Sequence, residues 1–246
     1  MKALITGANK GIGFAIAEAL GKSGVGILVG ARSESHGQEA VKKLSAQGIT
    51  ASFVKIDLND FDTIHNAAEE IDQLDLLINN AGIPDSHKGD RPDLDIRKTA
   101  FDYTTDDLRE TLEVNFLGTH EMIRSFLPKL AADGKIVNIT IPIQPTNYWH
   151  PLAYQTSKAA QNVMAMNYAL EFKNTGSRKQ IFGIMPGGVA TDLNGLTAGA
   201  LDGYIKSTEE AGEFIAKLAL DMENHNGQMI QYDGKIVTDY EVQLHG

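Results

Sequence analysis

Short apolar runs alternate with segments of helical periodicity along the whole chain. The run KALIT at 2–6 is followed by Ile12, Ile16 and Leu20, whose spacing predicts a helix that ends near Gly24. Further strands are predicted at 26–31, 53–58, 74–82, 135–140, 180–186 and 228–233, and further helices around Val41 and Leu44, around Ile64 and Ile71, over Leu108–Leu130, over Ser157–Phe172 and near Phe214–Leu220. Strands rich in Ile, Leu and Val with helices between them predict an α/β fold, a doubly wound parallel sheet covered on both faces.

Composition narrows the functional classes. The chain has 246 residues, of which 42% are hydrophobic, and no repeat or linker divides it, so we expect one domain over 1–246. The net charge of −10 gives no basic surface for nucleic acid. No apolar run reaches the roughly 18 residues of a membrane span, and the first strand enters a glycine loop directly, so we expect neither a membrane segment nor a signal peptide.

The absence of cysteine excludes disulfides and thiolate metal sites, and it fits the reducing conditions of the cytoplasm, where we expect the protein to reside. The seven histidines are scattered along the chain without metal-ligand spacing, so we expect no metal.

A glycine-rich loop separates the first predicted strand from the first predicted helix. TGANKGIG spans residues 6–13 and contains Gly7, Gly11 and Gly13. Glycines at this place permit a tight turn, close approach of the backbone to a ligand, and close packing of the helix on the sheet. The N–H groups at the start of the helix would then face a phosphate. The G-x-x-x-G-x-G spacing differs from the commoner G-x-G-x-x-G pattern, but its place between strand and helix favours a nucleotide site over a structural turn.

Five further motifs follow this loop in order. They are Asp57–Leu58 after the third strand, NNAG at 79–82, VNFLGT with Asn115, YQTSK at 154–158 and PGGVATD at 186–192. Together with TGANKGIG they resemble the short-chain dehydrogenase/reductase family over essentially the whole chain, and TGANKGIG and the closing GQMIQYDGKIV look most like its carbonyl-reductase branch. The resemblance implies a single Rossmann-type domain that binds NAD(P), with cofactor contacts at Gly7, Lys10, Gly11, Ile12, Gly13, Arg32, Asp57, Leu58, Asn80, Tyr154, Lys158, Val189 and Thr191.

The resemblance also implies an oxidoreductase that interconverts a carbonyl group and an alcohol, with Tyr154 as the general acid or base. Free Tyr has a pKa near 10, which is too high for efficient work near neutrality. Lys158 lies one helical turn later on the same face, and its charge would lower the pKa of Tyr154. In the family the matching lysine bonds the nicotinamide ribose, and the residue matching Asn115 holds a water that links this lysine to solvent.

Two basic residues favour NADP over NAD. An NAD site usually offers an acidic residue at the end of the second strand, but here that strand ends with GARS and Arg32. Arginine suits bidentate contact with the 2′-phosphate of NADP. Lys10, inside the glycine loop, matches a second basic position that is typical of NADP-preferring members of the family. We therefore expect NADPH as the cofactor.

One position departs from the family pattern. The serine that binds the substrate oxygen lies thirteen residues before the tyrosine in the family, and this count leads to Ile141. An apolar side chain cannot donate a hydrogen bond, and one lost donor costs about 10²–10³ in rate. Thr140 could take over, or another polar group could serve, from Gln144, Asn147 or Tyr148. Alternatively, the protein is a nucleotide-binding sensor or interaction protein with little turnover.

The partner implied by the resemblance is a small carbonyl compound or alcohol, and the chain is expected to be a monomer or a homo-oligomer. The identity of the substrate depends on the loops Ile83–Tyr103 and Asn194–Ser207, whose conformations the sequence does not fix.

Overall fold

Seven parallel strands form one sheet in the computed structural model, which describes residues 1–84, 98–145, 151–191 and 197–237. The strand order is β3-β2-β1-β4-β5-β6-β7, and every neighbouring pair is parallel. The strands are β1 (Lys2–Thr6), β2 (Gly26–Ala31), β3 (Ala51–Lys55), β4 (Leu74–Asn79), β5 (Leu130–Ile139), β6 (Gln180–Met185) and β7 (Met229–Gln231). The predicted doubly wound parallel sheet is confirmed.

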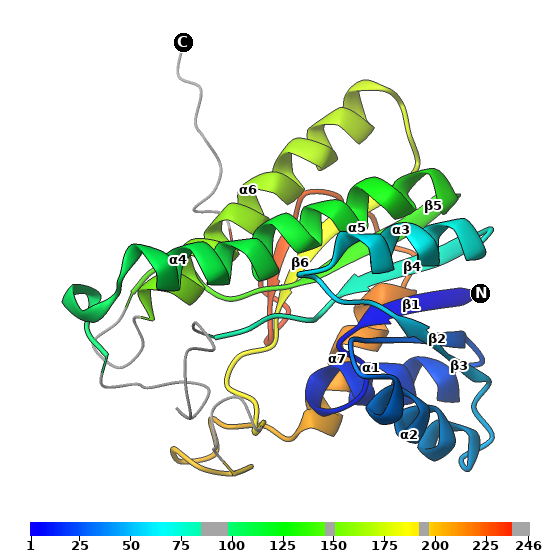
Figure 1. Ribbon diagram of the computed structural model, residues 1–246, viewed down its shortest axis with the longest axis horizontal. Helices are drawn as coiled ribbons and strands as arrows, with labels where there is room; N and C mark the ends of the chain where they lie inside the picture. The colour runs from blue at the N-terminus through cyan, green and yellow to red at the C-terminus, as the bar shows by residue number, and fades with distance from the viewer. Residues whose placement is uncertain (85–97, 146–150, 192–196, 238–246) are drawn as a thin grey trace.

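Helices cover both faces of the sheet (Figure 1). One face carries α1 (Gly11–Lys22), α2 (Glu34–Ser45) and α7 (Thr208–Leu220), and the other carries α3 (Phe61–Glu70), α4 (Thr105–Leu112), α5 (Thr119–Phe126) and α6 (Leu152–Asn174). Each layer has its own apolar core, built around Ile16, Leu44 and Ile215 on the first face and around Ile64, Ile123 and Phe172 on the second. Within the part of the chain that is described, no helix is both long and apolar enough to cross a membrane.

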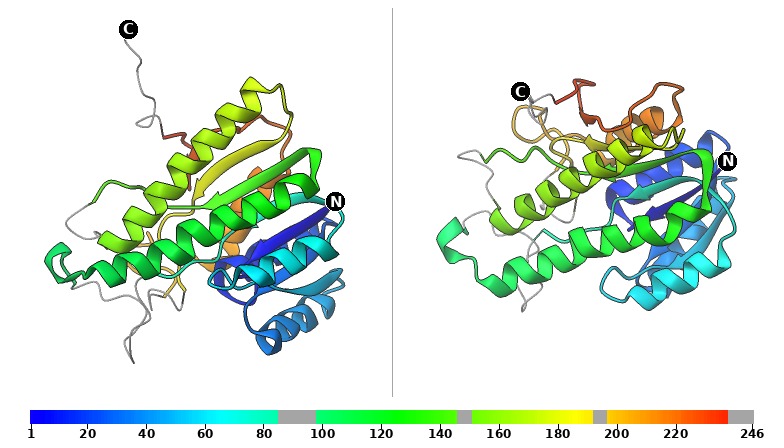
Figure 2. Two further views of the ribbon diagram at one scale, coloured as in Figure 1. Left: turned by 45° about the horizontal axis from the view of Figure 1, so that its top comes forward. Right: turned by 90° about the horizontal axis from the view of Figure 1, so that it is seen from above.

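The long predicted helix Leu108–Leu130 is divided in the structure. A π-helical turn, η2 (Glu113–Gly118), separates α4 from α5, and a short 3₁₀ turn at Leu127–Lys129 follows α5. Pro128 in that last turn has no N–H group with which to continue an α-helix. The helix therefore ends before Leu130. Figure 2 shows α6 running alongside the rod formed by α4, η2 and α5.

The predicted helix Ser157–Phe172 begins earlier than expected, at Leu152 after Pro151. Tyr154 therefore lies inside the first turn of α6 and shares its helical geometry with Lys158.

The strand order places a topological switch point between β1 and β4. From β1 the chain proceeds outward through β2 and β3, and it then returns to β4 on the other side of β1. In open α/β sheets, ligands bind in the crevice outside the carboxyl ends of the strands at such a point. The glycine loop follows β1 and the NNAG motif follows β4, so both flank this crevice.

Candidate active site

The glycine loop forms a cradle at the carboxyl end of β1. Gly7 and Gly11 have φ values of +67° and +58°, which favour glycine. A Cβ on Gly13 would overlap the carbonyl oxygen of Gly7, so the third glycine lets α1 pack against the turn. Lys10 precedes α1 without a side-chain cap, and Ile12 is half-buried in the first turn. The loop therefore leaves the start of α1 suited to an anion such as a phosphate.

Asn80 ties the end of β4 to this cradle. Its side-chain Nδ2 donates to the carbonyl oxygen of Thr6 at 3.0 Å. The hydroxyl oxygen of Thr6 accepts the backbone N–H groups of Asn80 and Ala81, each at 3.0 Å. The two loops that flank the switch point are thus fixed to each other by hydrogen bonds.

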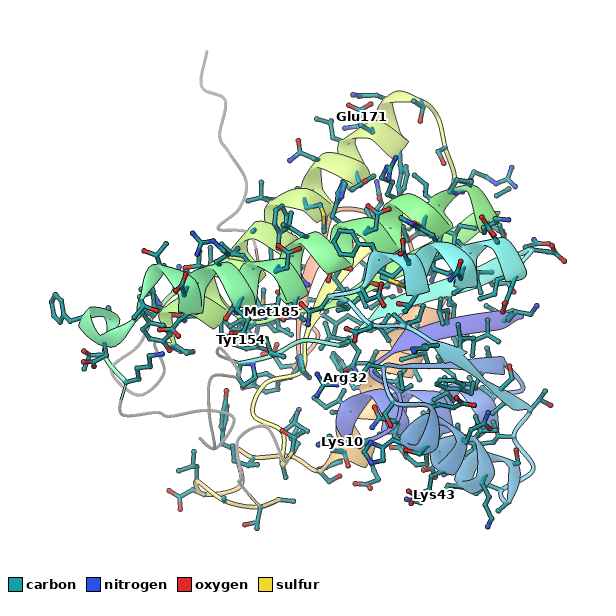
Figure 3. All side chains as sticks on the ribbon, in the orientation of Figure 1. Lys10, Arg32, Lys43, Tyr154, Glu171 and Met185 are labelled. Atoms are coloured by element: carbon teal, nitrogen blue, oxygen red, sulfur yellow. The ribbon has the colours of Figure 1, made fainter. Side chains whose placement is uncertain are left out.

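Arg32 and Lys10 lie beside the cradle, as the sequence predicts. Arg32 is exposed and directly follows Ala31, the last residue of β2. The backbone N–H of Ala8 donates to the carbonyl oxygen of Gly30 at 3.1 Å, which holds the glycine loop against the end of β2. Figure 3 shows the labelled Lys10 and Arg32 in the same region of the molecule. Both residues therefore lie at the carboxyl end of the sheet, next to the glycine loop.

The ends of β3 and β6 contribute the remaining predicted cofactor residues. Asp57 follows β3, and its carboxylate accepts the backbone N–H of the next residue but one at 3.0 Å, while Leu58 is buried. Val189 follows β6 and is buried. Thr191 lies close to the glycine loop: a Cβ built on Gly11 would be 3.9 Å from its methyl carbon. The structure therefore brings residues from the carboxyl ends of five strands to one edge of the sheet.

Tyr154 and Lys158 share one face of α6. The Nζ atom of Lys158 lies 5.7 Å from the ring centroid of Tyr154. Lys158 is only 2% exposed, and its Nζ donates to the carbonyl oxygen of Ile139 at 2.8 Å. Because Ile139 is the last residue of β5, this bond fixes the tyrosine–lysine pair at the same edge of the sheet.

Burial controls the protonation of both side chains. It raises the pKa of Tyr154 to about 12 and lowers the pKa of Lys158 to about 7. The expected lowering of the pKa of Tyr154 by Lys158 is not met here, because desolvation of the phenol raises that pKa instead. Tyr154 therefore keeps its proton near neutral pH, and a protonated phenol is a proton donor.

Asn115 joins the loop after β4 to α6. Its Oδ1 accepts the N–H of Ile83 and its Nδ2 donates to the carbonyl oxygen of Ile83, both at 2.8 Å. The same Nδ2 donates to the hydroxyl of Ser157 at 2.9 Å, and that hydroxyl donates to the carbonyl oxygen of Tyr154 at 2.7 Å. Ser157 was not predicted, although its place beside Lys158 in YQTSK was the available signal. The buried Asn115 thus supports the first turns of α6.

Thr140 is bonded inside the core. It is 1% exposed, and its hydroxyl donates to Oδ1 of Asn162 at 2.7 Å. Asn162 lies eight residues beyond Tyr154 on α6, which corresponds to about 12 Å along the helix axis. Whether Thr140 replaces the missing serine therefore stays a prediction, and in the structure its hydroxyl is bonded to Asn162.

The serine position itself is occupied by the half-buried Ile141. Gln144 is exposed, and Asn147 and Tyr148 lie outside the described residues.

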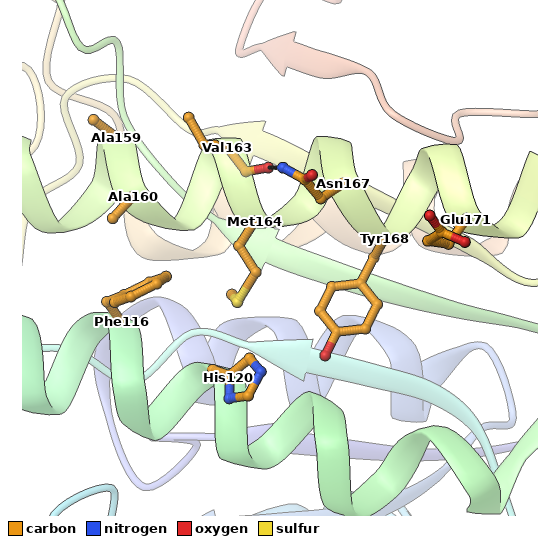
Figure 4. Close-up of a pocket in the computed structure, with 9 residues that line it drawn as sticks. All are labelled: Phe116, His120, Ala159, Ala160, Val163, Met164, Asn167, Tyr168 and Glu171. Atoms are coloured by element: carbon orange, nitrogen blue, oxygen red, sulfur yellow. Dashed lines mark hydrogen bonds between the residues drawn. The ribbon is translucent and has the colours of Figure 1, made fainter.

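A groove of about 710 Å³ lies between α6 and the rod of η2 and α5 (Figure 4). Its lining is mostly apolar and contains none of the predicted site residues: Phe116, His120, Ala159, Ala160, Val163, Met164, Asn167, Tyr168 and Glu171. Met164 also packs in the core, as expected for a methionine on this helix. Across the four described ranges, no three His, Asp or Glu side chains gather where they could hold a metal ion.

The buried lysine predicts a pH dependence of stability. The pKa of Lys158 in the folded chain, about 7, is below its ordinary value of 10.5, so the unfolded chain binds more protons between these two values. We therefore expect the stability of the protein, relative to Lys158→Met, to rise from pH 7 to pH 10 by up to about 1.4 kcal/mol per pH unit and to level off below pH 7. Urea unfolding of both proteins across this range measures the difference. A difference that is flat from pH 7 to pH 10 would mean that Lys158 titrates normally.

Comparison with known families agrees with this geometry. The family model described as short chain dehydrogenase matches residues 1–199. The chain is 31% identical to short-chain dehydrogenase anuI of Penicillium roqueforti, in an alignment that covers 96% of this chain and 93% of the relative. It is 28% identical to carbonyl reductase [NADPH] 1 of Mus musculus, over 93% of this chain and 95% of that protein.

Solved structures share the fold. A short-chain dehydrogenase from Burkholderia cenocepacia, solved in complex with NADP, matches with a TM-score of 0.77 at 24% identity, covering 94% of this chain and 96% of that one. A dehydrogenase/reductase from Sinorhizobium meliloti matches with a TM-score of 0.79 at 23% identity, covering 94% of this chain and 92% of that one.

Proposed function

The chain belongs to the short-chain dehydrogenase/reductase family of NAD(P)-dependent oxidoreductases, and on that premise we propose that it uses NADPH to reduce the carbonyl group of an aldehyde or ketone to an alcohol. The relatives named carbonyl reductase [NADPH] support this choice of cofactor and reaction. The observation that carries the proposal is the placement of Tyr154 and Lys158 at the same sheet edge as the glycine cradle and Arg32.

The residues present fit NADPH. The cradle has room for a phosphate, and a Cβ on Gly11 would meet nothing nearer than 3.9 Å. The residues that would hold the cofactor are Gly7, Lys10, Gly11, Ile12, Gly13, Arg32, Asp57, Leu58, Asn80, Tyr154, Lys158, Val189 and Thr191. Bound NADPH supplies the hydride for the reduction.

Tyr154 donates the proton in the proposed reaction. Burial raises its pKa to about 12, so the phenol carries its proton at neutral pH and can act as the acid. The hydroxyl hydrogen-bonds the carbonyl oxygen and transfers its proton as negative charge develops there. The ammonium group of Lys158, 5.7 Å from the ring centroid, then stabilises the phenolate. Asn115 and Ser157 hold the backbone of this turn in place.

The cofactor preference has a direct test. We expect NADPH to bind about 5- to 150-fold more tightly than NADH, because a charge-assisted contact of Arg32 to the 2′-phosphate is worth about 1–3 kcal/mol. Arg32→Asp should remove this preference. Lys43→Asp is the matched control. Lys43, labelled in Figure 3, is an exposed cation of α2 that pairs with Glu39, and its replacement should leave the preference for NADPH unchanged. Equal dissociation constants for the two cofactors in the unmodified protein would contradict the assignment.

Ile141 favours a second candidate function. The family's oxygen-binding serine is missing there, and the hydroxyl of Thr140 is bonded to Asn162. The alternative is a protein that binds NADPH as a sensor or interaction partner with little turnover. The intact Tyr154, Lys158 and Asn115 favour the enzyme.

Turnover separates the two candidates. NADPH oxidation is measured against a panel of aldehydes, ketones and diketones, with carbonyl-free buffer as the blank. We expect oxidation that depends on the carbonyl compound for part of the panel. Tight NADPH binding without oxidation above the blank would favour the sensor.

A further inference from the structure

A buried glutamine connects Lys158 to the π-helical turn. Gln161 lies three residues after Lys158 on α6 and is 0% exposed. Its Oε1 accepts a hydrogen bond from Nζ of Lys158 at 3.2 Å. Its Nε2 donates to the carbonyl oxygen of Asn115 and, at 2.9 Å, to the hydroxyl oxygen of Thr119. The amide therefore spans the space between Lys158 and Asn115.

The chemistry of these partners fixes the orientation of the amide. A lysine ammonium group is only a donor and a backbone carbonyl is only an acceptor. If the amide were rotated by half a turn, Nε2 would face the ammonium group and Oε1 would face the carbonyl oxygen of Asn115. Only the observed orientation satisfies both partners, because it places Oε1 against the ammonium group and Nε2 against the carbonyl oxygen of Asn115. The second hydrogen of Nε2 bonds the hydroxyl of Thr119.

The carbonyl oxygen of Asn115 has no free lone pair in this arrangement. A carbonyl oxygen has two acceptor sites. One receives Nε2 of Gln161 and the other receives the hydroxyl of Thr119 at 2.8 Å. In the family resemblance, the residue matching Asn115 holds a water that links to the lysine. In this chain the side-chain amide of Gln161 joins Asn115 to Lys158 directly.

We infer that Gln161 is a positioning residue for the proposed carbonyl reduction, whose amide takes the place of a bridging water between Asn115 and Lys158. This inference rests on the proposed function for its catalytic meaning. The carbonyl oxygen of Ile139 and Oε1 of Gln161 accept two hydrogen bonds from Nζ, and together they hold it 5.7 Å from the ring centroid of Tyr154. A side-chain amide does not relay protons as a water molecule does. In this inference, Tyr154 is therefore not reprotonated along a path through Gln161 and Asn115.

Gln161 supplies one of the two oxygen atoms that accept hydrogen bonds from Nζ of Lys158, and Ile139 supplies the other. Tyr154 is the titratable group that faces Lys158 from α6, while η2 and α5 contribute the uncharged Asn115 and Thr119, and β5 contributes the carbonyl of Ile139. Among the described residues, no carboxylate forms an ion pair with Nζ of Lys158. Burial lowers the pKa of Lys158. A hydrogen bond from the ammonium group to Oε1 of Gln161 favours the charged form.

The test is the titration of Lys158 in the cofactor-free protein, followed by NMR of ¹³C-labelled lysine and assigned from the signal lost in Lys158→Met. Gln161→Met removes the acceptor at similar volume and should lower the midpoint by about one to two pH units, since a hydrogen bond to a charged group is worth about that much. Gln161→Glu places a negative charge there and should raise the midpoint. Asn162→Leu is the control, because it removes the neighbouring buried amide that bonds Thr140 and should leave the midpoint unchanged.

Activity provides an independent second readout. In carbonyl reduction, the pH profile of kcat should move in the same direction as the midpoint of Lys158 for each variant. Unchanged midpoints in folded Gln161 variants would overturn the inference. Should Gln161→Met not fold, Gln161→Glu decides alone, and an unshifted or lowered midpoint there would overturn it. A wild-type protein without turnover would refute the proposed function, while the NMR result would still decide the contact.

Discussion

Replacing Tyr154 with phenylalanine is expected to lower the turnover of carbonyl reduction by about 10²–10⁴-fold, the contribution typical of a positioned general acid. The variant keeps the aromatic ring and removes only the hydroxyl that donates the proton. NADPH affinity should therefore stay close to that of the unmodified protein. Steady-state kinetics and cofactor titration together measure the two effects.

Tyr168→Phe is the matched control for this variant. Tyr168 lies on the same helix, about 21 Å along its axis from Tyr154, and lines the groove between α6 and the rod (Figure 4). We expect its turnover to equal that of the unmodified protein. A Tyr154→Phe variant that remains active would show that the tyrosine and lysine of YQTSK share a helix face without catalytic meaning.

Replacing Ile141 with serine is expected to raise turnover, by up to the 10²–10³ that one donor to a developing oxyanion contributes. The serine would stand where the family places its oxygen-binding hydroxyl, at the end of β5 and thirteen residues before Tyr154. Loss of apolar contacts lowers stability, so thermal unfolding must accompany the kinetics. Unchanged turnover in a folded Ile141→Ser variant would show that the site does not lack a donor at this position.

Thr140→Val tests whether the hydroxyl that follows β5 binds the substrate oxygen. Its hydroxyl bonds Asn162 inside the core, so the substitution should cost about 1–3 kcal/mol of stability by leaving the buried amide oxygen without this donor. We expect turnover to change little. A large loss of kcat at unchanged stability would restore Thr140 as the substrate-binding hydroxyl.

The sequence predicts the sheet, the cradle and the tyrosine–lysine pair because each follows from local pattern. Gly7, Gly11 and Gly13 are required by the turn and by the close packing of α1, so their spacing is visible in the chain. Tyr154 and Lys158 are one helical turn apart, and any helix there places them on one face.

The remaining features depend on tertiary contacts. Whether Thr140 faces Tyr154 or the core depends on which face of β5 its side chain occupies, and the pairing with Asn162 decides this only in the folded chain. The raised pKa of Tyr154 results from desolvation in the folded chain, which the local sequence does not show. The bond of Gln161 to Asn115 joins residues 46 positions apart, although the spacing of Gln161 from Lys158 on the helix was a usable signal.

The most direct test of carbonyl reduction follows the hydride itself. The protein is incubated with NADPH deuterated at C4 of the nicotinamide and with a carbonyl compound that promotes oxidation, and the alcohol is analysed by mass spectrometry. We predict one deuterium on the carbon that carried the carbonyl group, and loss of this product in Tyr154→Phe. A folded, NADPH-binding protein that yields no deuterated alcohol from any aldehyde, ketone or diketone would contradict the proposed function.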